Sequence, residues 1–176
     1  KNLELTLSGY EDLLLQLYTD DETVELVENI NSTDNTALAG SQLLRKLREV
    51  SYTKPYIESI MVIPAQGDPI FFDRLTAAST RSSWMDSYGY SIEDIYNKTI
   101  SSPWTVIFPT SHAFTIIEKE YYLFHMAHRL IDYRHIDKEV GIVVFSINQN
   151  LLDELCNEGK PVDLVTLQNR LKEKEL

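Results

Sequence analysis

The sequence PYIESIMVIPAQGDPIFFD, residues 55–73, contains the pattern that decides the fold of this chain. Apolar residues fill most of Ile57–Ile63, which is typical of a largely buried β-strand. Gln66-Gly67-Asp68 follows and consists of residues that favour tight turns and tolerate positive φ. Pro69–Asp73 then returns as a second strand. The segment therefore predicts a β-hairpin.

Further strands are expected downstream of this hairpin, over Trp104–Pro109, Tyr121–Tyr133 and Val140–Ile147. Between the hairpin and the third strand, residues 74–103 form an insertion rich in aromatic and hydroxyl side chains, with a short helix expected over Ile92–Lys98 behind Ser91 as its cap. A closing helix is expected from residues 148–150 onward. Consecutive antiparallel strands with short connections build such a sheet without crossovers.

Helical periodicity precedes the strands. A first helix has an apolar stripe within Leu7–Tyr18, a second runs from about Thr23 through Ile30, and a third carries Leu38, Leu43, Leu44 and Leu47 and ends before Pro55. Helices followed by an antiparallel sheet define the α+β class. We expect an N-terminal helical region over 1–55, a sheet domain over 56–156 and a C-terminal tail over 157–176 that is either helical where it packs or frayed.

Composition restricts the partners of the chain. Its 176 residues include 27 acidic and 16 basic side chains, for a net charge of −11, so a polyanion such as DNA or RNA is repelled. No apolar run reaches the roughly 18–20 residues that span a bilayer. Cys156 is the single cysteine, so no intramolecular disulfide forms, and we expect it to be a small buried apolar residue.

A family resemblance rests on the order of several segments. Pro55–Ile60 with Gly67 and the second strand, then Trp84, Trp104, Arg129–Asp132 and finally Val140–Ile147 before a Leu-Leu helix, resemble the Cache domains of bacterial sensor kinases. The resemblance implies a PAS-like antiparallel sheet of about five strands outside the cell. In the parent protein it implies two flanking membrane spans and a cytoplasmic histidine kinase.

Two features depart from that family. Many relatives carry a second, membrane-proximal sheet domain, for which only about twenty residues remain here. Amino-acid-binding relatives pair an arginine with a tryptophan two positions later, whereas Arg81 and Trp84 are three apart. The motif therefore does not support amino-acid recognition.

The insertion holds most of the candidate ligand-binding residues, and the expected strands after it hold the rest. Aromatic walls with a few polar groups suit small ligands, and an arginine provides a bidentate donor to a carboxylate or phosphate. The candidates are Trp84, Tyr88, Tyr90, Trp104, Arg81, Arg129 and Asp132. The alternative is that the aromatic residues only pack the insertion onto the sheet and that Asp132 is a turn or strand-end carboxylate.

The sequence gives little indication of a catalytic site, a metal site or a cofactor site. His125 and His128 are three apart on an expected strand, so their imidazoles face opposite sides and cannot chelate one ion. No GxSxG, GxGxxG, GxxxxGK[ST] or HExxH motif occurs. We therefore expect a domain without catalytic activity, metal or cofactor.

The function expected from the resemblance is ligand sensing in the ectodomain of a two-component histidine kinase. Alternatives are the ectodomain of a chemoreceptor or cyclic-dinucleotide enzyme, a protein-interaction module without a small ligand, and an enzyme with an unrecognised site. The Leu7–Tyr18 stripe is expected either to form the seam of a homodimer or to cover the sheet.

Overall fold

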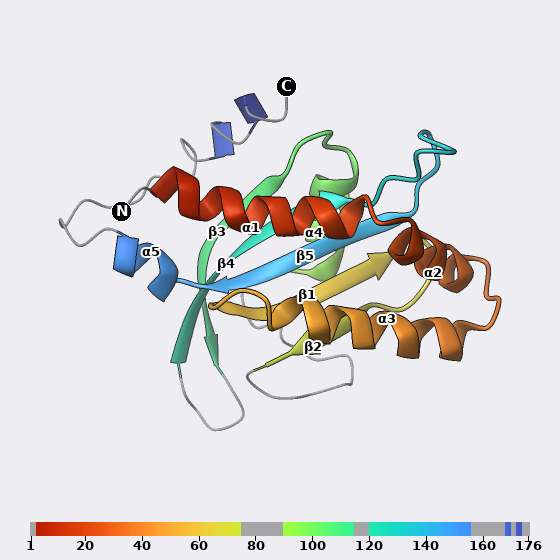
Figure 1. Ribbon diagram of the computed structural model, residues 1–176, viewed down its shortest axis with the longest axis horizontal. Helices are drawn as coiled ribbons and strands as arrows, with labels where there is room; N and C mark the ends of the chain where they lie inside the picture. Colours follow the sequence, from red (N-terminus) through yellow and green to blue (C-terminus); the bar gives the residue numbers. More distant parts are fainter. Residues whose placement is uncertain (1–2, 75–89, 115–119, 156–167, 170–171, 174–176) are drawn as a thin grey trace.

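The central β-sheet is antiparallel, and its strands lie in the order β2-β1-β5-β4-β3 (Figure 1). The computed structural model describes residues 3–74, 90–114, 120–155, 168–169 and 172–173. Within this part of the chain the strands are β1 (Ile57–Pro64), β2 (Ile70–Asp73), β3 (Val106–Phe114), β4 (Glu120–Arg129) and β5 (Gly141–Asn148). The predicted hairpin is β1–β2. The other side of β1 pairs with the central strand β5, which does not follow it in the chain, so the expectation of a sheet without crossovers was wrong.

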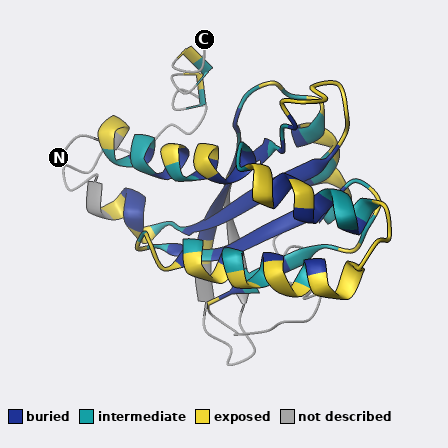
Figure 2. Cartoon of the chain, turned by 45° about the vertical axis from the view of Figure 1, so that its right-hand side comes forward, coloured by how far each residue is buried: buried dark blue, intermediate teal, exposed yellow. Residues whose placement is uncertain are grey.

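Helices cover both faces of this sheet. Helices α1 (Leu3–Tyr18), α2 (Asp21–Asn31) and α3 (Thr36–Ser51) lie on one face, and α4 (Ile92–Ile100) lies on the other (Figure 1). A short helix, α5 (Asn150–Leu155), follows β5. Figure 2 shows the consequence, since the strands between the helices are almost continuously buried. The predicted α+β class, with N-terminal helices and a helix in the insertion, is confirmed.

Residues of one strand alternate between the two cores. Val62 and Val143 belong to the core under the N-terminal helices, whereas Met61 and Val144 belong to the core under α4. This alternation follows from the two-residue period of a strand. We call the surface of the sheet that faces α4 the α4 face, and the opposite surface the α1 face.

Side-chain caps define the starts of α2 and α4. Asp20 caps α2 by accepting a hydrogen bond from the Thr23 amide at 3.0 Å, and Ser91 caps α4 by accepting from the Asp94 amide at 3.0 Å. Burial by itself raises the pKa of Asp20, but hydrogen bonds from Lys46 and Thr23 outweigh it and lower the pKa overall. Lys46 Nζ lies 2.5 Å from Asp20 Oδ2 and thereby joins α3 to the start of α2.

The stripe within Leu7–Tyr18 is buried against the sheet. Leu7 and Leu14 are fully buried, and α1 contacts β4 and β5. Of the two roles that the sequence leaves open for this stripe, the structure therefore shows cover of the sheet. In α3 the buried apolar positions are Ala39, Leu43 and Leu47, while Leu38 is exposed.

Two strand ends differ from the sequence-based expectation. β3 continues through Pro109 to Phe114, because it is the edge strand and its register shifts between Phe108 and Ser111. An edge strand tolerates a proline, whose missing N–H faces away from the ladder. β4 ends at Arg129 rather than at Tyr133, so the predicted fourth strand was too long.

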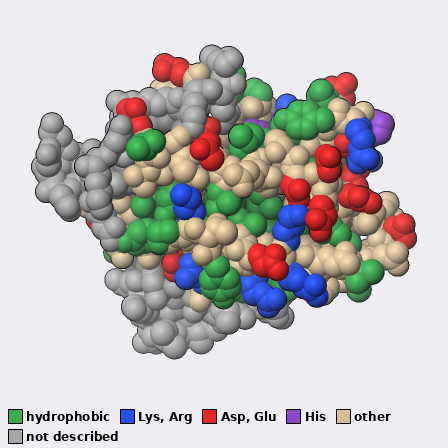
Figure 3. Space-filling view, in the orientation of Figure 1, with side chains coloured by type: hydrophobic (Ala, Val, Ile, Leu, Met, Phe, Trp, Pro, Cys, Tyr) green, Lys and Arg blue, Asp and Glu red, His purple; other side chains and the backbone are tan. Residues whose placement is uncertain are grey.

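Charged side chains of both signs lie on the described surface that Figure 3 shows. On the face shown in Figure 3, acidic and basic side chains of the described residues are interspersed over α2 and α3. Among the helices that the structure describes, none combines the length and the apolar character needed to cross a lipid bilayer.

The first residue of β5 is confined by the neighbouring strand. Gly141 has φ of +147°, and a Cβ atom at this position would lie 2.4 Å from the carbonyl oxygen of Ile63 on β1. A side chain would meet both a forbidden backbone conformation and a backbone atom that cannot move aside.

Gly141→Ala is therefore expected to lower the free energy of unfolding by at least about 2 kcal/mol. Gly40→Ala is the matched control, because Gly40 lies within α3 and its added Cβ would be 3.4 Å from Ile70 Cδ1. The control is expected to gain up to about 1 kcal/mol from helix propensity. Urea unfolding measures both changes, and equal stabilities for the two variants would contradict the strain at Gly141.

Candidate functional site

One cross-strand row of the α4 face is polar. Asp73 of β2 pairs with Ser59 of β1, Ser59 pairs with Ser146 of β5, and Ser146 pairs with His125 of β4. Residues that are direct partners across a sheet project from the same face. The next partner of His125 is Phe108 on β3, so the row crosses all the strands of the sheet. We call Asp73, Ser59, Ser146 and His125 the polar row.

The next cross-strand row on this face, two residues further along each strand, is entirely apolar. It consists of Phe71, Met61, Val144, Ala127 and Val106. These side chains pack with Ile95 and other residues around α4 in one core. The polar row thus lies beside an ordinary hydrophobic core, and its composition is not a general property of this face.

Every member of the polar row is buried. Asp73, Ser59, Ser146 and His125 are each at most 1% exposed. The Ser59 hydroxyl finds no hydrogen-bond partner among the described residues. Burial of an unpaired hydroxyl costs about 1–3 kcal/mol of folding free energy. A native protein therefore keeps such a hydroxyl mainly where a ligand or another functional contact uses it.

Tyr90 covers the histidine end of this row. Its ring stands at 90° to the His125 ring with 5.9 Å between centroids, and it also meets the Phe108 ring edge-on at 5.5 Å. Its hydroxyl donates to the carbonyl of Pro109 at 3.1 Å, which holds the ring against β3. Burial raises the pKa of Tyr90, so this hydroxyl stays protonated as a donor.

His125 is a neutral hydrogen-bonding group. Its Nδ1 lies 2.9 Å from the hydroxyl oxygen of Ser146, and burial lowers the pKa of His125 to about 3. Ser146 and His125 resemble the nucleophile and base of a hydrolase in spacing alone. An imidazole with so low a pKa is a weak general base near neutral pH. The polar row therefore offers a ligand hydrogen-bonding groups, one carboxylate and an aromatic edge. Its imidazole is poorly suited to general base catalysis.

The structure describes four of the seven predicted site residues. Tyr90 lies at the polar row, beside His125, and its role as the wall of a pocket stays a prediction. Trp104 is half-buried just before β3, where its backbone exchanges hydrogen bonds with the Ser102 hydroxyl. Trp84, Tyr88 and Arg81 lie outside the described residues, as does Cys156.

Arg129 and Asp132 lie away from the polar row. Arg129 ends β4 on the α4 face, four residues beyond His125, which corresponds to about 13 Å along a strand. Asp132 was predicted to be on a strand, and this prediction was wrong. Its carboxylate accepts a hydrogen bond from the Arg134 amide at 3.0 Å and thereby forms a turn after the strand.

The charge state of Asp132 is consistent with that turn. Burial by itself raises the pKa of Asp132, but the Arg134 hydrogen bond and the nearby cations Arg134 and His135 lower it overall. The alternative that the sequence left open, a turn carboxylate, therefore describes Asp132.

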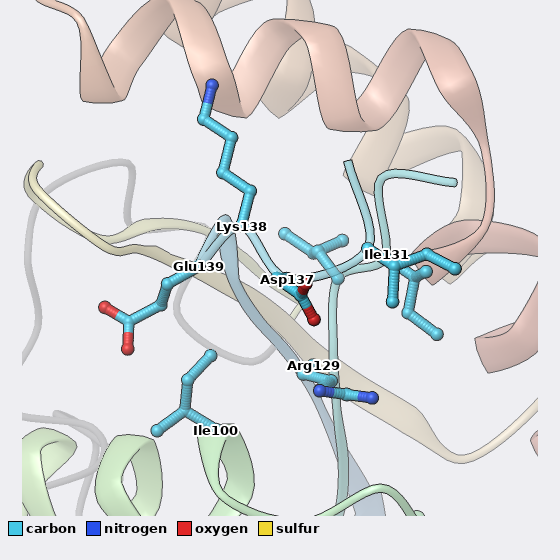
Figure 4. Close-up of a pocket in the computed structure, with 8 residues that line it drawn as sticks. Ile100, Arg129, Ile131, Asp137, Lys138 and Glu139 are labelled. Carbon is cyan, nitrogen blue, oxygen red and sulfur yellow. The ribbon is translucent and has the colours of Figure 1, made fainter. Parts of the chain in front are cut away.

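A cavity of about 280 Å³ lies beside Arg129 (Figure 4). It is bounded by Ile100 at the end of α4 and by residues 130–131 and 136–139 of the loop between β4 and β5. This cavity and the polar row occupy opposite ends of the α4 face, with the apolar row between them.

The two histidines of β4 lie on opposite faces, as expected for strand residues three apart. His125 contacts Tyr90 on the α4 face, whereas the His128 ring stacks on the Tyr18 ring of α1 at 3.7 Å between centroids and 3° between planes. His128 Nδ1 donates to the carbonyl of Arg129 at 2.7 Å, which fixes the ring against the strand. The two imidazoles cannot chelate one metal ion in this arrangement.

Sequence reasoning missed Ser59, Asp73 and Ser146 and considered His125 only as a metal ligand. A signal was present, because Ser59 and Ser146 interrupt otherwise apolar runs of strands that were expected to be buried. The alignment of the four residues in one row depends on strand order and register, which the sequence does not state.

The low pKa of His125 has a consequence for stability. The folded chain keeps the imidazole neutral down to pH about 3, while the unfolded chain protonates it below about pH 6.5. Between these values the unfolded chain binds more protons, so the free energy of unfolding falls with decreasing pH, by at most about 1.4 kcal/mol per pH unit. His125→Gln is expected to remove this contribution, measured by urea unfolding between about pH 6 and pH 4.

Ser146→Ala serves as the control, because it loses the hydroxyl partner but keeps the buried imidazole. Its stability is expected to depend on pH as steeply as that of the wild type. A pH dependence that is unchanged in His125→Gln would contradict a neutral, buried His125.

Known proteins resemble this chain in fold rather than in sequence. No family model and no curated protein matches the sequence. Among solved structures, the periplasmic sensory domain of the Campylobacter jejuni chemoreceptor Tlp1 is similar, with a TM-score of 0.53 and 10% identity over 89% of this chain and 62% of that one.

Two more distant structures are the ligand-binding domain of the Pseudomonas fluorescens chemoreceptor CtaA in complex with L-valine and the extracellular domain of a candidate histidine kinase, soHK1S-Z6. The CtaA domain has a TM-score of 0.48 and 15% identity, over 90% of this chain and 60% of that one. The soHK1S-Z6 domain has a TM-score of 0.45 and 12% identity, over 86% of this chain and 64% of that one. This chain therefore spans less than two thirds of each of the three structures. The Tlp1 comparison confirms the sensor-domain fold expected from the sequence.

Proposed function

We propose that this chain is an extracytoplasmic sensing domain that binds a small polar ligand at the polar row of the α4 face. The observation that carries this proposal is the buried polar row itself, with the Ser59 hydroxyl lacking a partner among the described residues. A ligand that hydrogen-bonds Ser59 and its neighbours would offset the cost of burying them. The fold shared with a periplasmic sensory domain supports the same function.

The chemistry of the row favours a ligand with both donors and acceptors. Asp73 accepts hydrogen bonds when ionised, the two serine hydroxyls donate and accept, and a neutral imidazole does each at one nitrogen. Tyr90 and Phe108 add aromatic edges beside His125. The aromatic residues Trp84 and Tyr88 and the cation Arg81 stay predicted members of this site.

The signal would travel through β4 and β5. These two strands carry His125 and Ser146 on one face, and α1 packs against the same strands on the other face. The Tyr18 carbonyl also accepts a hydrogen bond from the Ile131 amide at 3.0 Å, just beyond β4. A ligand that binds better to one arrangement of these strands would shift the population of α1 positions.

A more specific proposal concerns the class of receptor to which the parent protein belongs. We propose a membrane-anchored histidine kinase as the parent, on the family resemblance of the sequence, with a chemoreceptor as the second candidate. The Tlp1 domain belongs to a chemoreceptor and favours that second candidate as a parent. The cytoplasmic part of the parent chain decides between them, and a parent with cytosolic domains on both sides of this segment would contradict both.

Dimerisation is also part of this proposal, with one restriction. A homodimer through the N-terminal helices would use faces of α1 other than the buried stripe, because that stripe already covers the sheet.

A thermal-shift screen tests the ligand site. Small polar metabolites, including organic acids, amines, sugars and nucleobases, are tested at increasing concentration on the wild type and on Ser59→Ala and Ser146→Ala. A ligand at one hundred times its Kd stabilises the folded state by about 2.7 kcal/mol, which raises the Tm by about 5–10 °C. Loss of one hydrogen bond in either variant is expected to weaken binding by about fivefold or more.

Ser51→Ala is the matched control. Ser51 is a fully buried serine too, but it lies at the end of α3 and donates to the Arg48 carbonyl at 2.6 Å. It is expected to bind the ligand as the wild type does. A ligand that binds all four proteins equally well would remove the polar row from the site. Absence of any hit would favour an interaction module without a small ligand.

A further inference from the structure

The cavity beside Arg129 lies at the end of the α4 face away from the polar row, and its lining residues differ from those of the row. We propose that it is a second binding site, separate from the polar row, for a short-chain monocarboxylate whose carboxylate binds Arg129. The proposal does not depend on the ligand of the polar row, because the two places share no residue.

The guanidinium of Arg129 is the main argument. Its Nε is buried and has no hydrogen-bond partner among the described residues, and no ion pair to its side chain occurs in that part of the chain. A partly buried cation without a counter-charge is costly. A guanidinium fork matches a carboxylate in geometry, so an anion entering the cavity would supply the missing partner.

The other charged residues of the cavity do not compensate Arg129. Lys138 extends away from Arg129 and pairs with Glu28 of α2, whose hydrogen bond raises the pKa of Lys138 (Figure 4). Glu139 contributes with burial to a raised pKa of Tyr96 on α4. Asp137 is exposed on the loop and points toward Arg129 in Figure 4, without an ion pair between the two.

These carboxylates restrict the charge of the ligand. Asp137 and Glu139 at the rim repel a second negative charge, so a monoanion is favoured over a phosphate dianion. The remaining wall is apolar and includes Ile100, Ile131 and Ile136. A cavity of about 280 Å³ therefore has room for a carboxylate with a short aliphatic tail against this wall.

The test is an NMR titration of the isotope-labelled chain that follows the Arg129 Nε–Hε resonance. The probes are sodium butyrate, sodium acetate, sodium phosphate and sodium chloride at matched ionic strength. Butyrate is expected to give a saturable shift and to bind at least about fourfold more tightly than acetate, the effect of burying one of its two additional methylenes. A similar saturable shift with chloride, or tighter binding of phosphate than of butyrate, would overturn the proposal.

Two variants with opposite expected effects make the test specific. Arg129→Gln removes the cation and is expected to weaken butyrate binding by about tenfold or more, followed by backbone amide shifts. Asp137→Asn removes a like charge on an exposed loop and is expected to tighten binding by about twofold or more. Asp137→Asn leaves the fold undisturbed, so the proposal stays testable even if Arg129→Gln does not fold.

The controls separate this site from a general charge effect and from the polar row. Arg134→Gln removes an exposed cation on the same loop, which interacts with Asp132 instead, and Ser59→Ala alters only the polar row. Both are expected to bind butyrate as the wild type does. Unchanged binding in Arg129→Gln, or weaker binding in Asp137→Asn, would overturn the proposal.

Discussion

The structure depends on burying the central strand on both of its faces. β5 pairs with β1 on one side and β4 on the other, and every residue of Gly141–Ile147 is buried. A strand of this kind cannot remain in a sheet that has only one covered face, because half of its apolar side chains would meet water. The three N-terminal helices and α4 supply the two covers.

The same constraint makes the polar row informative. A serine or histidine in a strand that is buried on both faces must find hydrogen bonds inside the protein or from a ligand. Ser146 and His125 find each other at 2.9 Å, whereas Ser59 has no partner among the described residues. The row therefore combines an internal network with unused hydrogen-bonding capacity, as a preformed polar binding surface would.

The helices on the two faces of the sheet are also connected through the strands between them. β4 carries His125 toward α4 and His128 toward α1, and the His128 ring stacks directly on the Tyr18 ring of α1. A change in the position of β4 at the polar row would thus reach α1 across the thickness of one sheet. The proposed sensing function would require such a path between a ligand site and a helix on the opposite face.

The sequence by itself determined the element types and their order. The β-hairpin of residues 57–73, the cap Ser91 and the closing strand could all be predicted, because each rests on local periodicity or on a local hydrogen bond. The end of β4 and the continuation of β3 through Pro109 could not, because a turn and an edge position decide them.

The candidate site was decided almost entirely by the tertiary structure. The aromatic residue Tyr90 could be found from composition, and it lies beside His125. The alignment of Asp73, Ser59, Ser146 and His125, by contrast, joins residues up to 87 positions apart along the chain, through β2, β1, β5 and β4. Strand order and register follow from the packing of the whole core, and a single sequence contains no local signal for either.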